Sequence, residues 1–222
     1  MAIQLSHHLP TPNLNYDKHP NASLSTTSSS PRFATLRANA ISGNPQKLIQ
    51  SGVVRSILPK EAASIIESEG YKLLDVRPEW EREKALVFGS VHVPLFVEDK
   101  DNSPITLLKK WVHFGYIGLW TGQKFTMINP EFLKQVEAEF PNKEAKILSA
   151  CGEGLRSVMA VSKLHKAGYK RLGWLAGGFN RTSDTDFPAV EGTEKLQFAT
   201  IGGASYYFLK LLLLLRAVAK ES

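Results

Sequence analysis

Four short apolar runs recur between residues 53 and 190 and define the strands expected in this chain. Each has the length and apolar content of a strand that is buried on both faces. They read YKLLDVR (71–77), VHVPLFV (91–97), AKILSA (145–150) and GWLAGG (173–178). The last run ends in a pair of glycines, which predicts a turn.

Amphipathic segments with helical spacing separate these runs. Residues 58–70 carry Pro59 at the expected first turn and Gly70 at the expected stop. Residues 157–168 have the same spacing and close at Gly168. We therefore expect one helix before the first strand and one after the third.

Residues 129–140 predict a further helix, with Asn129 as its N-cap and Pro130 as its first residue. Apolar side chains recur there at helical intervals. Because strands alternate with helices, the pattern predicts an α/β domain at residues 53–190. Its sheet is expected to be mainly parallel and flanked by helices.

The connection at residues 98–126 departs from this alternation. It is rich in aromatic side chains: Trp111, His113, Phe114, Tyr116, Trp120 and Phe125. Such an insertion shapes a substrate pocket or a partner surface, or it packs against the domain as a satellite core. The sequence leaves both alternatives open.

Residues 198–219 (FATIGGASYYFLKLLLLLRAVA) predict an apolar C-terminal helix. Its length approaches the ~20 residues that span a bilayer. Lys210 and Arg216 each cost about 2.5–3.5 kcal/mol near a helix centre, whereas each leucine returns only about 0.5 kcal/mol. The alternatives are a marginal membrane anchor, a helix lying on a membrane, a helix docking on a protein partner, and a core helix.

Composition places the chain among soluble globular proteins, with 43% apolar and 22% charged residues in a length of 222. A single cysteine excludes an internal disulfide and a CxxC metal site, and it favours a reducing compartment.

The net charge of +6 belongs almost entirely to the N-terminus, because residues 1–60 carry six Lys or Arg and one acid. The remainder offers no basic face for nucleic acid, so a nucleic-acid partner is not expected.

Residues 1–40 are rich in Ser and Thr, poor in acids and free of a long apolar core. This composition predicts a disordered organelle transit peptide, plastid rather than mitochondrial, cut near residues 37–40. The alternative is a disordered tail that carries no address. A chloroplast location follows from the first interpretation, with the C-terminal helix as a candidate contact to the thylakoid or envelope membrane.

The single cysteine, Cys151, lies in the stretch ILSACGEGLRS, directly after an expected strand and before an expected helix. Ligands of open parallel sheets bind at this edge. Gly152 and Gly154 allow backbone N–H groups to converge on an anion, and Arg156 adds positive charge. The pattern therefore predicts a nucleophilic thiolate in a small anion cradle.

The Cys-x4-Arg loop, together with LLDVR (73–77) and LAGGF (175–179), resembles the rhodanese family of sulfurtransferases. The resemblance covers about residues 58–188. It implies a rhodanese-like fold and persulfide chemistry, in which a small sulfur donor charges Cys151 and a thiol acceptor discharges it. It implies no metal and no organic cofactor.

The resemblance also assigns roles to individual residues. Cys151 corresponds to the catalytic residue, and the loop that follows it binds the substrate. The loop residues are Gly152, Glu153, Gly154, Leu155 and Arg156. Asp75 and Arg77 are expected to form a structural brace rather than to act as catalysts. Related phosphatases carry a loop one residue longer, so phosphatase activity is not expected.

Two departures from the family pattern qualify the expected activity. Glu153 puts a carboxylate beside the expected thiolate, which disfavours the thiolate form and repels dianionic donors, so weak use of thiosulfate is expected. The segment after DVR is altered, and His92, the histidine nearest to that place, is expected to be structural. The alternative to an enzyme is a weak or inactive rhodanese module that docks a protein partner or acts as a membrane-tethered scaffold.

Overall fold

Five parallel strands form the central sheet of the computed structural model, which describes residues 45–221. In spatial order they are β1 (Val54–Ile57), β8 (Arg171–Leu175), β7 (Lys146–Ala150), β2 (Lys72–Asp75) and β4 (Val91–His92). The expected runs at residues 71–77, 145–150 and 173–178 thus lie side by side, with β7 paired to both β2 and β8. The expected transit peptide at residues 1–40 lies outside the described residues.

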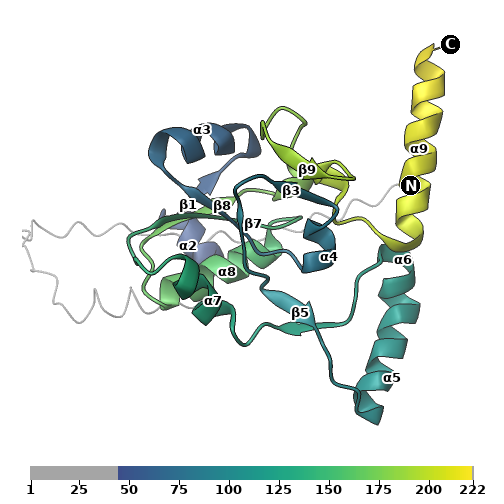
Figure 1. Ribbon diagram of the computed structural model, residues 1–222, viewed down its shortest axis with the longest axis horizontal. Helices are drawn as coiled ribbons and strands as arrows, with labels where there is room; N and C mark the ends of the chain where they lie inside the picture. Colours follow the sequence, from purple (N-terminus) through teal and green to yellow (C-terminus); the bar gives the residue numbers. More distant parts are fainter. Residues whose placement is uncertain (1–44, 222) are drawn as a thin grey trace, which may run out of the picture.

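Helices cover both faces of this sheet (Figure 1), as the alternating pattern predicts. On one face α2 (Pro45–Gln50), α7 (Phe132–Glu139) and α8 (Leu155–Lys166) bury Leu48, Phe132, Val136 and Leu164 in a shared core. On the other face α3 (Pro59–Glu69) buries Ala62 and Ile65 against β1, β2 and β8. Burial on both faces explains why the strands read as continuous apolar runs.

Helices α3 and α8 end just before the two glycines that the sequence predicted, and both glycines have left-handed backbone conformations. Gly70 has φ +73° and ends α3, and Gly168 has φ +93° just after α8. Only glycine adopts this conformation without steric cost, so these positions stop the helices where the sequence predicted.

The run at residues 91–97 is not one strand, which corrects the expectation. It splits at Pro94 into β4, which joins the central sheet, and β5 (Phe96–Glu98), which pairs antiparallel with β6 (Thr126–Ile128). Proline donates no ladder hydrogen bond, so the chain leaves the sheet at this residue. A second small antiparallel pair, β3 (Ala85–Val87) with β9 (Val190–Gly192), was not expected from the sequence.

The helix expected at residues 129–140 begins later than predicted. Helix α7 starts at Phe132, and its N-cap position is Glu131, which makes no side-chain cap. Asn129 caps the preceding turn instead, because its Oδ1 accepts from the Glu131 N–H at 3.0 Å.

The insertion at residues 98–126 forms α5 (Pro104–His113), the π-helical turn η1 (Phe114–Gly118) and the short α6 (Leu119–Thr121). Trp111, Phe114, Tyr116 and Trp120 are exposed, so the expectation of a satellite core is wrong. These helices extend away from the sheet along one edge of the molecule (Figure 1).

The expected C-terminal helix is present as α9 (Gly203–Glu221). It contacts α6 at its start and then leaves the domain (Figure 1), so the core-helix alternative is wrong. Among the described residues, no helix combines the length and the apolarity that crossing a bilayer requires.

A candidate active site around Cys151

Cys151 lies at the carboxyl end of β7, in the middle of the sheet, where the chain turns into α8. Gly154 makes this turn with φ +94° and is the N-cap residue of α8. A side chain at Gly154 would also meet the Trp174 ring at 3.1 Å. The Trp174 indole N–H donates to the Gly154 carbonyl at 2.9 Å, which fixes the loop against β8.

Three groups surround the Cys151 sulfur. The Gly154 N–H lies 3.1 Å from Sγ and the Ser157 N–H lies 3.3 Å from it. The Ser157 hydroxyl oxygen lies 3.4 Å from Sγ and is 2.9 Å from the Gly154 carbonyl, to which it donates. Backbone N–H groups aimed at one sulfur stabilise negative charge on it, as the anion cradle requires.

The cradle differs from the sequence prediction at two residues. The amide of Gly154 points to Sγ as expected, whereas the amide of Gly152 makes no hydrogen bond to the sulfur. Instead, the Gly152 carbonyl accepts from the Asn180 N–H at 2.8 Å. Ser157 was missed, although its place directly after Arg156, in the first turn of the expected helix, is a usable signal.

The turn at Gly177 and Gly178 holds the other side of this loop. The Cys151 carbonyl accepts from the Phe179 N–H at 2.8 Å. A Cβ at Gly178 would lie 2.3 Å from the carbonyl oxygens of Cys151 and Gly152. The downstream glycine motif is therefore needed for close contact with the Cys151 loop.

Arg156 forms a two-armed ion pair with Glu81, on α4 (Glu79–Arg82), with N–O distances of 2.7 and 2.6 Å. Glu81 is 1% exposed. Burial opposes the charge on Arg156, but the hydrogen bonds and charge of Glu81, together with a smaller contribution from Cys151, outweigh it, and the pKa of the guanidinium is raised. Sequence reasoning missed Glu81, because nothing distinguishes it from the neighbouring Glu79 and Glu83.

Asp75 and Arg77 form the expected ion pair at the end of β2. Both are fully buried, and Arg77 Nη2 lies 2.6 Å from Asp75 Oδ2. The same nitrogen donates to the Ala85 carbonyl at 2.8 Å, and the guanidinium lies 4.5 Å from the centre of the Phe179 ring. The pair thereby joins β2, β3 and the turn that supports Cys151. His92 Nε2 lies 2.9 Å from the Arg77 carbonyl oxygen, a structural contact.

A pocket of about 590 Å³ opens over the cysteine loop. Five parts of the chain line it: the cysteine loop, α4, the end of α6 with the connection after it, the turn η2 (Phe179–Arg181), and the segment that precedes and begins α9. The lining residues are Glu81, Thr121, Gln123, Cys151, Glu153, Leu155, Arg156, Asn180, Thr200, Ile201, Gly202 and Ser205. Glu153 and Leu155 are exposed, whereas Cys151 is 1% exposed.

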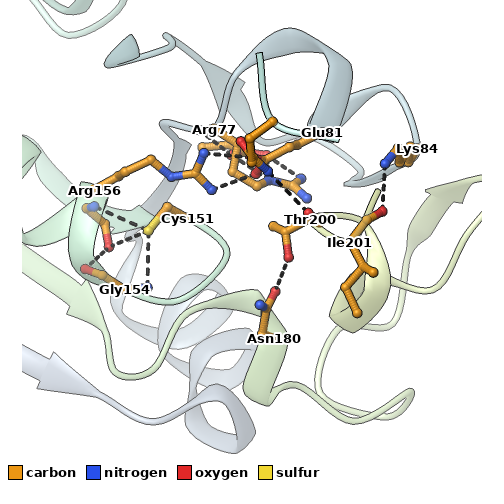
Figure 2. A network of polar contacts seen from close by, with 12 residues as sticks. Arg77, Glu81, Lys84, Cys151, Gly154, Arg156, Asn180, Thr200 and Ile201 are labelled. Atoms are coloured by element: carbon orange, nitrogen blue, oxygen red, sulfur yellow. Dashed lines mark hydrogen bonds and ion pairs between the residues drawn. The ribbon is translucent and has the colours of Figure 1, made fainter. Parts of the chain in front are cut away.

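Residues 200–202, which we name the closing segment, lie against the loop from outside the expected 53–190 domain. Thr200 packs closely on Gly152: a Cβ added at Gly152 would lie 2.3 Å from the methyl carbon of Thr200. The Gln123 amide donates to Glu81 at 3.1 Å and to the Thr200 carbonyl at 3.3 Å. The Thr200 hydroxyl bonds Asn180 at 2.9 Å, and Lys84 donates to the carbonyl of Ile201 at 2.8 Å (Figure 2).

Comparison of the sequence with known proteins finds relatives. Residues 58–184 match the rhodanese-like domain family. Rhodanese-like domain-containing protein 10 of Arabidopsis thaliana is 66% identical over 184 residues, which are 83% of this chain and 85% of that protein.

Two further Arabidopsis thaliana proteins carry the word chloroplastic in their names. Rhodanese-like domain-containing protein 11 is 40% identical and covers 72% of this chain and 54% of its own length. Rhodanese-like domain-containing protein 9 is 37% identical and covers 70% of this chain and 67% of its own length. The matches confirm the resemblance carried by the LLDVR, CGEGLR and LAGGF motifs.

Proposed function

The chain belongs to the rhodanese-like domain family, and we propose that it is a sulfurtransferase whose Cys151 carries sulfur as a persulfide. The observation that carries the proposal is the pair of N–H groups, from Gly154 and Ser157, directed at Sγ. Preorganised donors of this kind stabilise an anionic sulfur without reorganisation during the reaction.

The reaction proceeds in two displacements. The Cys151 thiolate attacks the outer sulfur of the donor, and a sulfur–sulfur bond forms as the donor's own bond to that sulfur breaks. The electron pair leaves with the rest of the donor, which is sulfite when the donor is thiosulfate. An acceptor thiolate then attacks the outer sulfur of the persulfide, and the electron pair of the breaking bond returns to Cys151.

The charges around the pocket favour donors less negative than thiosulfate. Glu81 and Glu153 both line it, while Arg156 is the one Lys or Arg among its described lining residues. Glu81 already compensates Arg156 with two hydrogen bonds. A dianion therefore meets a pocket with a surplus of negative charge, whereas a monoanionic persulfide is repelled less.

Intact mass of the full chain tests the proposal directly. After incubation with thiosulfate or cysteine persulfide, which carries one net negative charge when its persulfide is ionised, and desalting without reductant, we expect a gain of one sulfur atom, in a larger fraction of the protein with the persulfide. Dithiothreitol should remove it, and Cys151→Ser should not acquire it. Because the chain has one cysteine, the site of the adduct is unambiguous.

If neither donor adds sulfur to the folded protein, the proposed sulfurtransferase function is overturned. The thiol must then be shown to be reduced, by complete alkylation of the same sample after unfolding. The second candidate is a docking module, favoured by one observation: Cys151 is 1% exposed, with the closing segment lying against its loop. A docking module would still bind its partner after the substitution Cys151→Ser.

Glu153→Arg is expected to raise the rate with thiosulfate about three- to tenfold, because a repulsive charge at the pocket becomes attractive. Steady-state sulfite release measures it, and the gain should shrink as salt rises. Glu67→Arg is the matched control, since Glu67 is an exposed residue of α3 that does not line this pocket. An equal gain in both variants would refute a local effect of Glu153.

A plastid location is supported by the chloroplastic names of two relatives and by the composition of residues 1–40. We propose import into the chloroplast with removal of that segment. Incubation of the radiolabelled full chain with isolated chloroplasts tests this. A shortened product protected from added protease supports import, and a full-length, protease-sensitive product contradicts it.

A further inference from the structure

Most exposed large apolar side chains of the described residues lie on two segments. The first runs through α5, η1 and α6, and the second is α9. Trp111 is 75% exposed, Tyr116 85% and Tyr207 75%. Soluble proteins seldom leave so much contiguous apolar surface in water, so these segments indicate an interaction site.

The two segments are fixed to each other at one crossing. The rings of Trp120 and Phe208 lie 5.5 Å apart, and the Ser205 hydroxyl donates to the Trp120 carbonyl. Backbones meet there so closely that a Cβ at Gly122 would lie 2.5 Å from the Gly203 nitrogen. The helices follow one another along one edge of the molecule and extend in opposite directions from the crossing (Figure 1).

The inner face of α5 is polar and bonded within the protein. Thr106 donates to Asp101 at 2.6 Å, Lys110 donates to the Asp101 carbonyl at 2.7 Å, and His113 bonds the Gln123 carbonyl oxygen at 3.0 Å. These positions are spaced at helical intervals and occupy one side of the helix. The apolar side chains of α5 therefore lie mainly on the side turned away from these bonds.

Helix α9 divides its faces in a similar way. Tyr206 and Lys210, one turn apart, both bond Glu194, and these contacts lower the pKa of the Glu194 carboxyl. Leu211, Leu215 and Val218 are exposed at helical spacing on a different face. Each segment thus keeps one side bonded to the domain and leaves an apolar side in solvent.

The net charge of each segment is positive. Residues 104–125 contain Lys109, Lys110 and Lys124 and no acid. Residues 203–221 contain Lys210, Arg216 and Lys220 and one acid, Glu221. Apolar side chains with Trp and Tyr, bordered by Lys and Arg, suit the interface of an anionic bilayer. A second copy of the chain would bring like charges together, which disfavours self-association through this surface.

We propose that α5–α6 and α9 form one surface that docks the protein on an anionic membrane. The helices lie in the headgroup region rather than cross it, because no helix among the described residues fits a span. Thr121 and Ser205, at the crossing, also line the Cys151 pocket, so docking holds the pocket beside the lipid headgroups. Docking itself does not depend on sulfur transfer.

Co-sedimentation of the full chain with vesicles tests the surface. We expect binding to vesicles of phosphatidylcholine and phosphatidylglycerol that weakens as salt rises, with weaker binding to phosphatidylcholine alone. Trp111→Glu with Tyr116→Glu on the first segment, and Leu211→Glu with Leu215→Glu on the second, should each weaken binding at least about tenfold.

Phe88→Glu is the matched control, because Phe88 is 67% exposed and lies outside both segments. Binding that neither pair of substitutions changes comes from another part of the chain and overturns the proposal. If only one of the two pairs of substitutions weakens vesicle binding, the two segments do not form one joint surface. If the protein does not bind vesicles, and instead assembles with itself or with a protein partner, the proposal of a membrane-docking surface is overturned.

Discussion

Replacing Cys151 with serine is expected to reduce sulfur transfer at least about a thousandfold, to the uncatalysed rate. A serine hydroxyl in the same cradle is far less nucleophilic at neutral pH and forms no persulfide. The substitution barely alters volume, and Cys151 makes its backbone bonds to the Gly178 turn through its carbonyl, which serine retains. Sulfite or acceptor-persulfide release, with either donor, measures the loss.

Ser157→Ala is the graded comparison for this prediction. It keeps the nucleophile and the Ser157 N–H, and it removes the hydroxyl that lies 3.4 Å from Sγ and donates to the Gly154 carbonyl. We expect a loss of about tenfold, comparable to removing one neutral hydrogen bond. Equal losses in the two variants would point to a damaged loop rather than to a lost nucleophile, and an active Cys151→Ser protein would refute the mechanism.

Arg77→Met is expected to lower the free energy of unfolding by about 3–5 kcal/mol, because it removes the close, hydrogen-bonded partner of the buried Asp75 carboxylate. It leaves only Arg82, whose Nε lies 3.9 Å from Asp75 Oδ2. The side chains of Asp75 and Arg77 are both fully buried in the wild-type protein. The loss also removes the bond to the Ala85 carbonyl and the contact with the Phe179 ring. Urea denaturation followed by circular dichroism measures the change.

Arg55→Met is the matched control for this substitution. Arg55 pairs with Glu69 at 2.7 Å, but the two side chains are 47% and 37% exposed, so a loss of only about 0–1 kcal/mol is expected. Adding Asp75→Asn to Arg77→Met should recover part of the stability, since the buried charge is then gone. Similar losses at Arg77 and Arg55 would show that the brace is not needed for stability.

The main elements of the fold were predictable because their signals are local. The runs that became β2, β7 and β8 are short, apolar and bounded by turn residues, and Gly70 and Gly168 mark helix ends. The small strands β3, β6 and β9 were not predictable, since segments of three residues show no periodicity. Pro94 was visible in the sequence and should have divided the run at residues 91–97.

The candidate site was predictable only in part, for the same reason. Cys151, Gly154 and Arg156 belong to one short loop, so their proximity follows from the spacing alone. Glu81, Gln123 and Thr200 come from three distant parts of the chain and meet only because the sheet and the closing segment bring them together. From the sequence, Arg156 was therefore expected to bind an anion, and its pairing with the Glu81 carboxylate was not foreseen.

The sequence by itself determined the family, the parallel α/β sheet and the position of Cys151 at a strand end, because each depends on residues close together in the chain. Tertiary structure alone decided that Glu81 compensates Arg156 and that Thr200 packs on Gly152. It also decided that the aromatic insertion is exposed and adjoins the C-terminal helix. Long-range pairs depend on how the whole chain packs, and a single sequence carries no local signal of that packing.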